Sequence, residues 1–367
     1  MIKSEVLSIG FGGCGNNLLD TFLGLDFRYS GIFMNTNLSE MENKVHFDRE
    51  RRCFYIANAD GTGKDRSVGE KYFKQDSPKF VEMIVKYVNQ KHVILKCSAN
   101  GGTGSISSLL GARLIKKSCP EKSISLIATM PNIGEGDIDF KNAIAFWNEL
   151  NIALDKGIIN NVSLIDNNSK MSQDEINRIA MDTLDLSFSD VINNSLDSSD
   201  VARYHRSRGY NVTLKLDNTY RDTNDAINDA IDNSVFFIPT SNKENGNIEC
   251  DTLVATVNIN DFKVEEIEKR FSAYEFKKIN QTTEGDTIIL LGGCDMPEDA
   301  IELTQEALKE VQKRKTMRKG RQKQNLIVEI DENDVQPKTE SKNTKVPSRI
   351  SSKDLNDLFA DDSFWED

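Results

Sequence analysis

The sequence predicts an α/β protein in which a parallel sheet carries helices on both faces and a smaller mixed α/β domain follows. Three observations support this fold class. Short apolar runs alternate with helical patterns up to about residue 170, which is typical of a parallel sheet with crossover helices. Two glycine-rich turns each join an apolar run to a helical pattern. The 367 residues are enough for two domains and a sizeable core.

The first half of the chain is expected to alternate strands and helices. The apolar runs expected to form strands are Val6–Ile9, Gly31–Met34, Arg52–Ile56, Val93–Cys97, Ile124–Thr129 and Val162–Ile165. The helical patterns between them include Asn16–Phe22, Val68–Tyr72, Lys79–Val88 and Phe140–Asp155. Ligands of such sheets bind at the carboxyl ends of the strands, and both glycine-rich turns fall there.

A long helix is expected next, over residues 172–194. Ser172 is a candidate N-cap, with Glu175 at the capping-box position. Pro297 opens a further helix that begins at Glu298, in keeping with the preference of proline for a first turn. Between these two helices, the mixed domain has strand candidates at Tyr210–Leu216, Val235–Ile238, Thr252–Ile259 and Thr287–Leu291.

The end of the chain differs in composition from the rest. Between Lys309 and Lys323 there are eight Lys or Arg residues and one Glu, so the last helix becomes strongly basic. Residues 324–352 are expected to be a flexible linker because they are polar with little periodicity. The final residues, 353–367, combine six acidic residues with apolar ones. They are interpreted either as a solvated tail or as a docking motif, whose contacts would be Phe359, Phe364 and Trp365.

Composition argues against several classes of function. The net charge of −12 opposes nucleic-acid binding by the whole chain. No apolar run approaches the ~20 residues of a membrane span, and the N-terminus lacks the apolar region of a signal peptide. The six cysteines form no C-x-x-C pair and the three histidines are far apart. We therefore expect reduced thiols in the cytoplasm, no direct membrane contact and no His-based metal site.

The two glycine-rich turns, Gly10–Asn17 and Asn100–Ser105, point to phosphate binding. Glycines allow backbone N–H groups to turn inward, and the N-terminus of the following helix adds partial positive charge. The chain has no P-loop motif with its lysine, so backbone amides and hydroxyls must hold the phosphates. The first turn also matches a dinucleotide fingerprint, but Met34–Asn37 offers no acidic residue at the ribose position.

Six loops, taken together, resemble the nucleotide loops of the tubulin/FtsZ superfamily. The matching segments are Gly10–Asn17, Met34–Asn37, Ala59–Lys64, Asn100–Ser105, Pro131–Gly136 and Ser163–Asn168. The resemblance implies GTP and GDP as ligands, with Mg²⁺. It also implies the tubulin/FtsZ fold, with a Rossmann-like GTP-binding domain (residues 1–170), a central helix (171–195), a second domain (196–297) and a C-terminal basic helix (298–323).

The resemblance assigns nucleotide contacts position by position. Glu135 falls on the ribose-binding glutamate, either Asn167 or Asn168 on the guanine contact, and Asn177 on a further base contact in the central helix. No protein ligand for the metal is implied. The expected nucleotide contacts are Gly12, Gly13, Cys14, Asn17, Asn35, Gly61, Thr62, Gly63, Asn100, Gly101, Gly102, Thr103, Gly104, Ser105, Glu135, Asn167 and Asn177.

The segment Ser195–Asp200 resembles the catalytic loop of the same superfamily. That loop carries two carboxylates, which enter the nucleotide site of the next subunit and position the attacking water. Asp197 and Asp200 fall on those two positions. A carboxylate beside a water can orient it or accept its proton. The resemblance thus implies a head-to-tail filament in which hydrolysis depends on assembly, whereas the alternative for these residues is a solvated turn.

Within the superfamily, three features favour the TubZ group of plasmids and phages. They are departures in the loops, such as Asp139 in place of the usual Arg, the long basic helix, and the acidic aromatic tail. This resemblance implies a filament that segregates plasmid or phage DNA. The tail would bind a DNA-binding adaptor of the TubR type, so DNA is contacted only indirectly. Two alternatives stay open: an FtsZ-like cell-division GTPase, and a nucleotide-binding module without a polymer.

Overall fold

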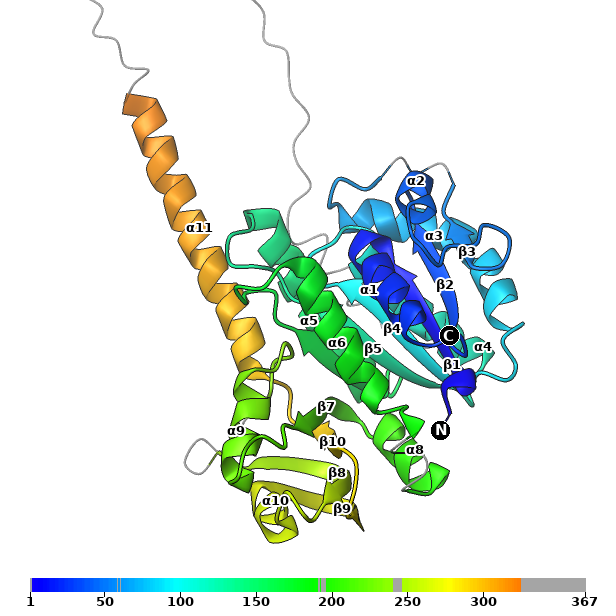
Figure 1. Cartoon of the computed structure of the whole chain (residues 1–367). Coiled ribbons are helices and arrows are strands. Elements are labelled where there is room, and N and C mark those ends of the chain that lie inside the picture. The colour runs from blue at the N-terminus through cyan, green and yellow to red at the C-terminus, as the bar shows by residue number, and fades with distance from the viewer. Residues whose placement is uncertain are drawn as a thin grey trace, which may run out of the picture. The chain divides into compact units, whose positions relative to one another are not determined.

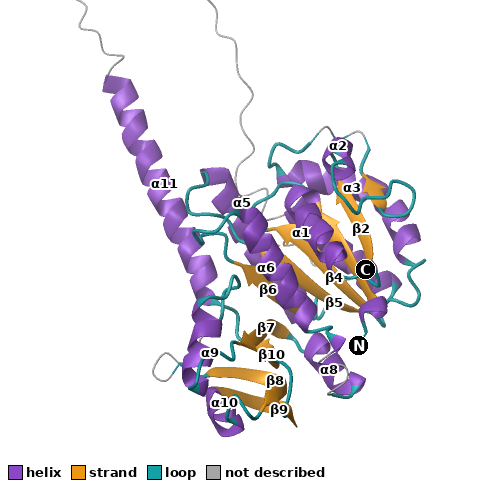
Figure 2. Cartoon of the chain, in the orientation of Figure 1, coloured by secondary structure: helices purple, strands orange, loops and turns teal. Residues whose placement is uncertain are grey.

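One continuous mixed sheet forms the centre of the molecule. The computed structural model describes residues 2–57, 59, 61–190, 192, 196–239 and 246–324. Within them, ten strands pair in the order β3-β2-β1-β4-β5-β6-β7-β10-β8-β9 (Figure 2). Residues 1–317 make up one compact unit, and the residues from 318 onward belong to a second unit. The expected α/β fold is confirmed.

The first six strands are parallel, as the alternating pattern predicts. Each lies within two residues of its predicted bounds at both ends. Because every strand runs in the same direction, their carboxyl ends lie at one edge of the sheet, where the loops can meet. The strands are β1 (Val6–Phe11), β2 (Ser30–Asn35), β3 (Cys53–Tyr55), β4 (His92–Ser98), β5 (Ser123–Thr129) and β6 (Asn161–Ile165).

Helices cover both faces of the parallel part (Figure 1). α1 (Gly12–Leu25) and α6 (Gln173–Leu186) share one hydrophobic cluster. On the other face lie α3 (Arg66–Ile84), α4 (Gly104–Ser118) and α5 (Asp137–Asp155). Successive side chains of a strand point to opposite faces, so Val6 packs with the first group and Leu7 with the second. A short helix, α2 (Leu38–Glu42), follows β2.

The second half extends the same sheet. β7 (Gly209–Leu216) pairs in parallel with β6 over two residues and antiparallel with β10 (Thr287–Cys294). β8 (Ile248–Asn258) is antiparallel to β10 and parallel to the edge strand β9 (Phe271–Thr282). The helices of this part are α8 (Ser198–Arg206), α9 (Thr223–Asp232) and α10 (Val264–Arg270).

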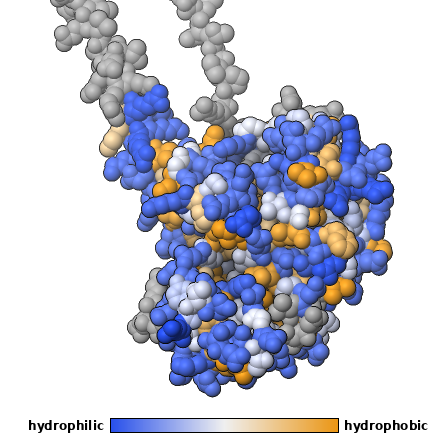
Figure 3. All heavy atoms as spheres, viewed as in Figure 1, coloured by the Kyte–Doolittle hydropathy of each residue, from blue (hydrophilic) through white to orange (hydrophobic). Residues whose placement is uncertain are grey.

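The last described element is the long helix α11 (Glu298–Gln324), which begins at the predicted residue. Ala300 and Ile301 in its first turn are buried, and Lys315 pairs with Asp137 of α5 at 3.2 Å. No described helix combines the length and apolar composition of a membrane span. Hydrophilic residues cover most of the face seen in Figure 3. The expected linker from 325 onward and the tail with Phe359, Phe364 and Trp365 lie outside the described residues.

The prediction of one helix over residues 172–194 is wrong at its C-terminal end. Ser172 caps α6 as expected, accepting a hydrogen bond from the Glu175 amide at 3.3 Å. The helix nevertheless stops at Leu186. Phe188, which has helical spacing in the sequence, instead stacks on His205 with ring centroids 4.3 Å apart. Burial against a residue distant in sequence therefore overrides the local periodicity.

Three further elements differ from the prediction. Val68–Tyr72 and Lys79–Val88 belong mostly to one helix, α3, which continues through Pro78 because Phe73 and Phe80 are both buried on the same core. Val235–Ile238 forms a single bridge to β6 rather than a strand. The edge strand β9 is absent from the prediction, because its charged and largely solvent-accessible residues give no apolar run.

Candidate functional site

Two adjoining cavities lie at the carboxyl ends of the parallel strands, with volumes of about 390 and 690 Å³. They share Cys14, Lys64, Ser98 and Asn100 as lining residues. We call the smaller one the glycine cavity and the larger one the carboxamide cavity. The glycine cavity is also lined by Phe11, Gly12, Gly13, Asn35, Thr36, Asn37, Glu40, Gly61, Thr62 and Gly101–Gly104. The carboxamide cavity adds Asn17, Thr129, Met130, Gly134, Glu135, Gly136, Asp139, Asn167, Gln173 and Asn177.

The glycine cavity is formed where two helix N-termini converge. α1 begins at Gly12 and α4 at Gly104. Neither helix has a side-chain cap or an acidic residue in its first turn. The first amide N–H groups of a helix lack partners within the helix and carry partial positive charge. Two uncapped helix ends at one cavity make it suited to an anion such as phosphate.

Close backbone contact explains why glycine occupies both helix starts. Gly12 has a φ of +72°, a region that favours glycine. A Cβ atom on Gly104 would lie 2.5 Å from the carbonyl oxygen of Phe11, closer than any side chain tolerates. The two glycine-rich turns therefore touch each other through their backbones. Cys14 also faces the cavity, and because burial raises the pKa of its thiol, that side chain adds no negative charge.

Carboxamides and carboxylates line the other cavity. Asn167 and Asn177 line it as the sequence predicts, and Gln173 joins them from the first turn of α6. The Asn132 side chain donates to the Asn167 carbonyl oxygen at 2.7 Å, which holds the loop that follows β6. Asn168 does not line the cavity; its amide group bonds Asp166 and the backbone of Ile133 instead. Amide groups can read the hydrogen-bonding edge of a base.

An ion pair and a second carboxylate lie in the carboxamide cavity, beside Lys64 and Asn100, which line both cavities. The Lys64 ammonium donates to Asp139, and the Asn100 amide donates to both Asp139 and Glu135. Burial raises the pKa of Glu135, and the adjacent Asp139 carboxylate raises it further. Burial would also raise the pKa of Asp139, but hydrogen bonds from Lys64 and the backbone bring it below its ordinary value. Asp139 thus stays charged, and Glu135 gains a proton more readily than usual.

Most of the expected nucleotide contacts line one or both cavities. Gly63 and Ser105 do not. The Ser105 hydroxyl is buried and donates to the Gly101 carbonyl oxygen at 2.5 Å, so it supports the turn from behind. Asp60, within the third loop, lies outside the described residues. The residues that line the cavities without having been predicted as contacts include Glu40, Lys64, Thr129 and Gln173.

Asp197 and Asp200 lie away from both cavities, at the start of α8. Asp197 is exposed and Asp200 half-buried. The length of strand β4 gives their separation from the site. Its first residue, His92, contacts His205 of α8 with ring centroids 4.9 Å apart. Its last residue, Ser98, lines both cavities. Seven strand residues span roughly 20 Å. Figure 1 shows α8 at the end of the sheet where β1 begins.

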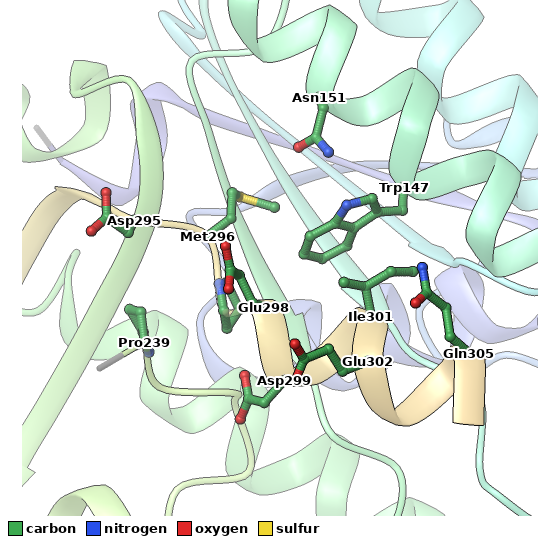
Figure 4. Close-up of a pocket in the computed structure, with 11 residues that line it drawn as sticks. Trp147, Asn151, Pro239, Asp295, Met296, Glu298, Asp299, Ile301, Glu302 and Gln305 are labelled. Atoms are coloured by element: carbon green, nitrogen blue, oxygen red, sulfur yellow. The ribbon is translucent and has the colours of Figure 1, made fainter. Parts of the chain in front are cut away.

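A still larger cavity, about 940 Å³, has a different chemical character. Figure 4 shows Trp147 and Asn151 of α5 on one side and the first turns of α11 on the other. No Lys or Arg is among its described lining residues. Burial raises the pKa of one lining carboxyl, Asp299, with Asp166 and Glu302 as neighbouring charges. This cavity is lined by four acidic residues, Asp295, Glu298, Asp299 and Glu302, and therefore repels phosphate.

Metal binding by protein side chains alone has no support in the described part of the chain, where no group of three or more His, Cys, Asp or Glu residues is placed to hold an ion. Mg²⁺ is commonly held by substrate phosphates with only one or two carboxylates. Glu40 is the one carboxylate among the described residues lining the glycine cavity, and it already accepts a hydrogen bond from Asn35 at 2.7 Å. The donor set fits an ion that arrives with phosphates.

Comparison with known proteins places these loops in one family. The model of the "Tubulin/FtsZ family, GTPase domain" matches residues 5–169. The tubulin-like protein TubZ of Clostridium botulinum C phage is 25% identical over 98% of this chain and 99% of its own length. The structure of Clostridium botulinum phage c-st TubZ with its C-terminal tail truncated superposes with a TM-score of 0.75 at 21% identity, covering 86% of this chain and all of that truncated chain. A GTPγS-form protofilament of Bacillus thuringiensis serovar israelensis TubZ gives a TM-score of 0.67 at 17% identity, covering 86% and 94%.

Proposed function

We propose that this chain, which belongs to the tubulin/FtsZ family and is a tubulin-like GTPase of the TubZ type, hydrolyses GTP when it assembles head to tail. We further propose that the filament segregates plasmid or phage DNA through a DNA-binding adaptor. The observation that carries the assembly part is the position of Asp197 and Asp200. They lie at the amino ends of the strands, whereas the cavities lie at the carboxyl ends.

The nucleotide would lie across both cavities. Its phosphates would occupy the glycine cavity, where two helix N-termini supply amide N–H groups. Its ribose would lie against Glu135 and its base against Asn167 and Asn177. Mg²⁺ on the phosphate oxygens would neutralise part of their charge. Phosphoryl transfer needs chiefly positioning and charge stabilisation, which amides and hydroxyls in these loops can supply.

Hydrolysis additionally needs a group that orients water. The N-cap and first turn of α8 offer two carboxylates, and the fold holds them roughly 20 Å from the cavities of the same subunit. Stacking one subunit on the next would bring these carboxylates to the neighbour's nucleotide, where Asp200 would orient the attacking water and Asp197 would support it. An interface between unlike ends of identical subunits repeats without closing and gives a filament. The protofilament form of a structural relative supports this arrangement.

The DNA-segregating role rests on a different set of residues. The net charge of −12 opposes direct binding to DNA. An adaptor of the TubR type, docked on the tail around Phe359, Phe364 and Trp365, would connect the filament to DNA. The similarity to a phage TubZ over 98% of the chain supports this role. The same similarity supports a cytoplasmic filament.

The assembly mechanism is tested by replacing Asp200 with Ala. Filaments should still form with GTP, but the turnover of GTP per subunit should fall at least tenfold, because water in the neighbour's site is no longer oriented. The measurements are phosphate release and sedimentation of the same samples.

Asp225→Ala is a matched control. Asp225 occupies the third position of α9, after an Asp N-cap, as Asp200 does in α8. The Asp225→Ala variant should leave GTP turnover unchanged, although it removes a similar charge from a helix N-terminus. A D200A protein that hydrolyses GTP like the parent would remove Asp200 from the mechanism.

A further inference from the structure

Lys64 is the one cationic side chain among the described residues that line the two cavities. The same surfaces carry three carboxylates, from Glu40, Glu135 and Asp139. A nucleotide brings several more negative charges. Backbone amides supply only partial charges, so a mobile full positive charge at this place has a large effect on anion binding.

The backbone of Lys64 is held in an uncommon conformation. Its φ is +66°, and no other described residue except glycine has a positive φ. Two contacts impose this conformation. The Asn142 side chain donates to the Lys64 carbonyl oxygen at 2.9 Å and to that of Asn100 at 3.0 Å. On the other side, a Cβ on Gly102 would lie 2.7 Å from the Lys64 Cα. Backbone strain imposed in this way is concentrated at functional sites.

The imposed conformation places the lysine between the two cavities. Gly61 and Thr62, from the same loop, line only the glycine cavity, whereas Lys64 also reaches the carboxamide cavity. The Lys64 Cα packs on Gly102 within the glycine-rich turn, and its ammonium group lies on Asp139. Because the lysine stem has four flexible carbons, rotation of the side chain can carry the charge from Asp139 toward that turn.

The two members of the Lys64–Asp139 ion pair differ in exposure and in their other hydrogen bonds, which favours such an exchange. The Lys64 side chain is 52% exposed and that of Asp139 only 7%. Asp139 accepts two more hydrogen bonds, from the Asn100 side chain at 3.1 Å and from the Gly136 amide at 3.3 Å. If the lysine leaves, the buried carboxylate therefore keeps two donors, and the cost of leaving a buried charge unpaired is reduced.

We propose that Lys64 is a phosphate-binding residue that exchanges Asp139 for the terminal phosphate of the bound nucleotide. This inference rests on the proposed GTPase function. It makes Lys64 a residue that favours a nucleoside triphosphate over the diphosphate, because the diphosphate leaves the ammonium group on Asp139. Asp139 acts in this exchange as the resting partner of the lysine.

The test compares the affinities for GTP and GDP, measured by calorimetry in the presence of Mg²⁺. The protein concentration is kept below the value at which filaments sediment. Lys64→Met should weaken GTP binding about tenfold, the worth of one charge-assisted hydrogen bond, with a smaller effect on GDP. Lys64→Arg should restore most of the preference for GTP. Lys141→Met is the matched control, because Lys141 pairs with Asp137 one turn away on the same helix, α5, but lines neither cavity.

Asp139→Asn separates phosphate binding from a purely structural ion pair. It frees the lysine, so GTP affinity should stay at the parent level or rise. If K64M and D139N weaken GTP binding equally, or if K64M keeps the parent's preference for GTP, the phosphate-binding role is wrong. If the parent chain binds neither GTP nor GDP, the proposed function itself fails, and that outcome is distinct from a failure of Lys64 alone.

Discussion

The two ends of the parallel sheet differ in how complete they are within one subunit. At the carboxyl ends, loops from six segments enclose cavities whose walls touch through glycine backbones. At the amino ends, Asp197 and Asp200 begin a helix with their side chains at least partly accessible. Folding of one chain produces a cavity suited to an anion but does not bring these carboxylates to it. The difference indicates that nucleotide binding and hydrolysis respond to different perturbations.

The largest effect is expected from Gly104→Ala. The new Cβ would lie 2.5 Å from the Phe11 carbonyl oxygen, so the two glycine-rich turns must separate. Overpacking costs typically 1–3 kcal/mol, and the displaced helix N-termini should lower nucleotide affinity by at least about tenfold. Calorimetric titration with GTP and thermal unfolding measure both effects.

Gly101→Ala is the control in the same turn, since its Cβ would meet nothing closer than 3.9 Å. It should keep the melting temperature of the parent. If G104A bound GTP like the parent, the contact between the two turns would have no part in forming the site.

A smaller effect is expected from mild acid, and it should act first at the amino ends of the strands. Burial lowers the pKa of His92 to about 3, with Lys96 and Arg206 as neighbouring positive charges, and burial likewise lowers that of His205. Phe188 stacks on His205, so this cluster connects α8 to the sheet. Below pH 6.5 the unfolded chain binds protons that the folded cluster excludes, and stability must fall as the pH falls.

The measurement compares GTP binding and assembly-dependent turnover between pH 7.5 and 5.5. Turnover should decrease several-fold while GTP binding changes less, because His205 belongs to α8, the helix that carries Asp200, and packs it against His92 of β4. His205→Gln keeps a polar side chain of similar length that does not titrate, so it should reduce the pH dependence of unfolding. Equal loss of binding and turnover would contradict the assignment of the effect to this end of the sheet.

Local signals account for what the sequence predicted well. The parallel strands are short apolar runs. Gly12 and Gly104 lie where the two turns touch through their backbones, and such a close contact requires glycine. The glycine-rich turns therefore indicated which edge of the sheet carries the cavities, and phosphate binding there stays a prediction. The capping of α6 by Ser172 is equally local.

Long-range contacts account for what could not be predicted. The end of α6 depends on Phe188 meeting His205, and the edge strand β9 depends on pairing with β8. Lys64 lies in a loop that resembles a known nucleotide loop, yet its position between the cavities follows from a positive φ imposed by Asn142 and Gly102. None of these contacts leaves a pattern in the neighbouring residues.

If assembly completes the hydrolytic site, GTP turnover per subunit must depend on protein concentration. Turnover is measured over a range of protein concentrations, with sedimentation of each sample. We expect almost no turnover below a threshold concentration and a steep rise above it, at the concentration where filaments first sediment. A turnover per subunit that is constant across all concentrations would contradict it, because the site would then be complete within a single chain.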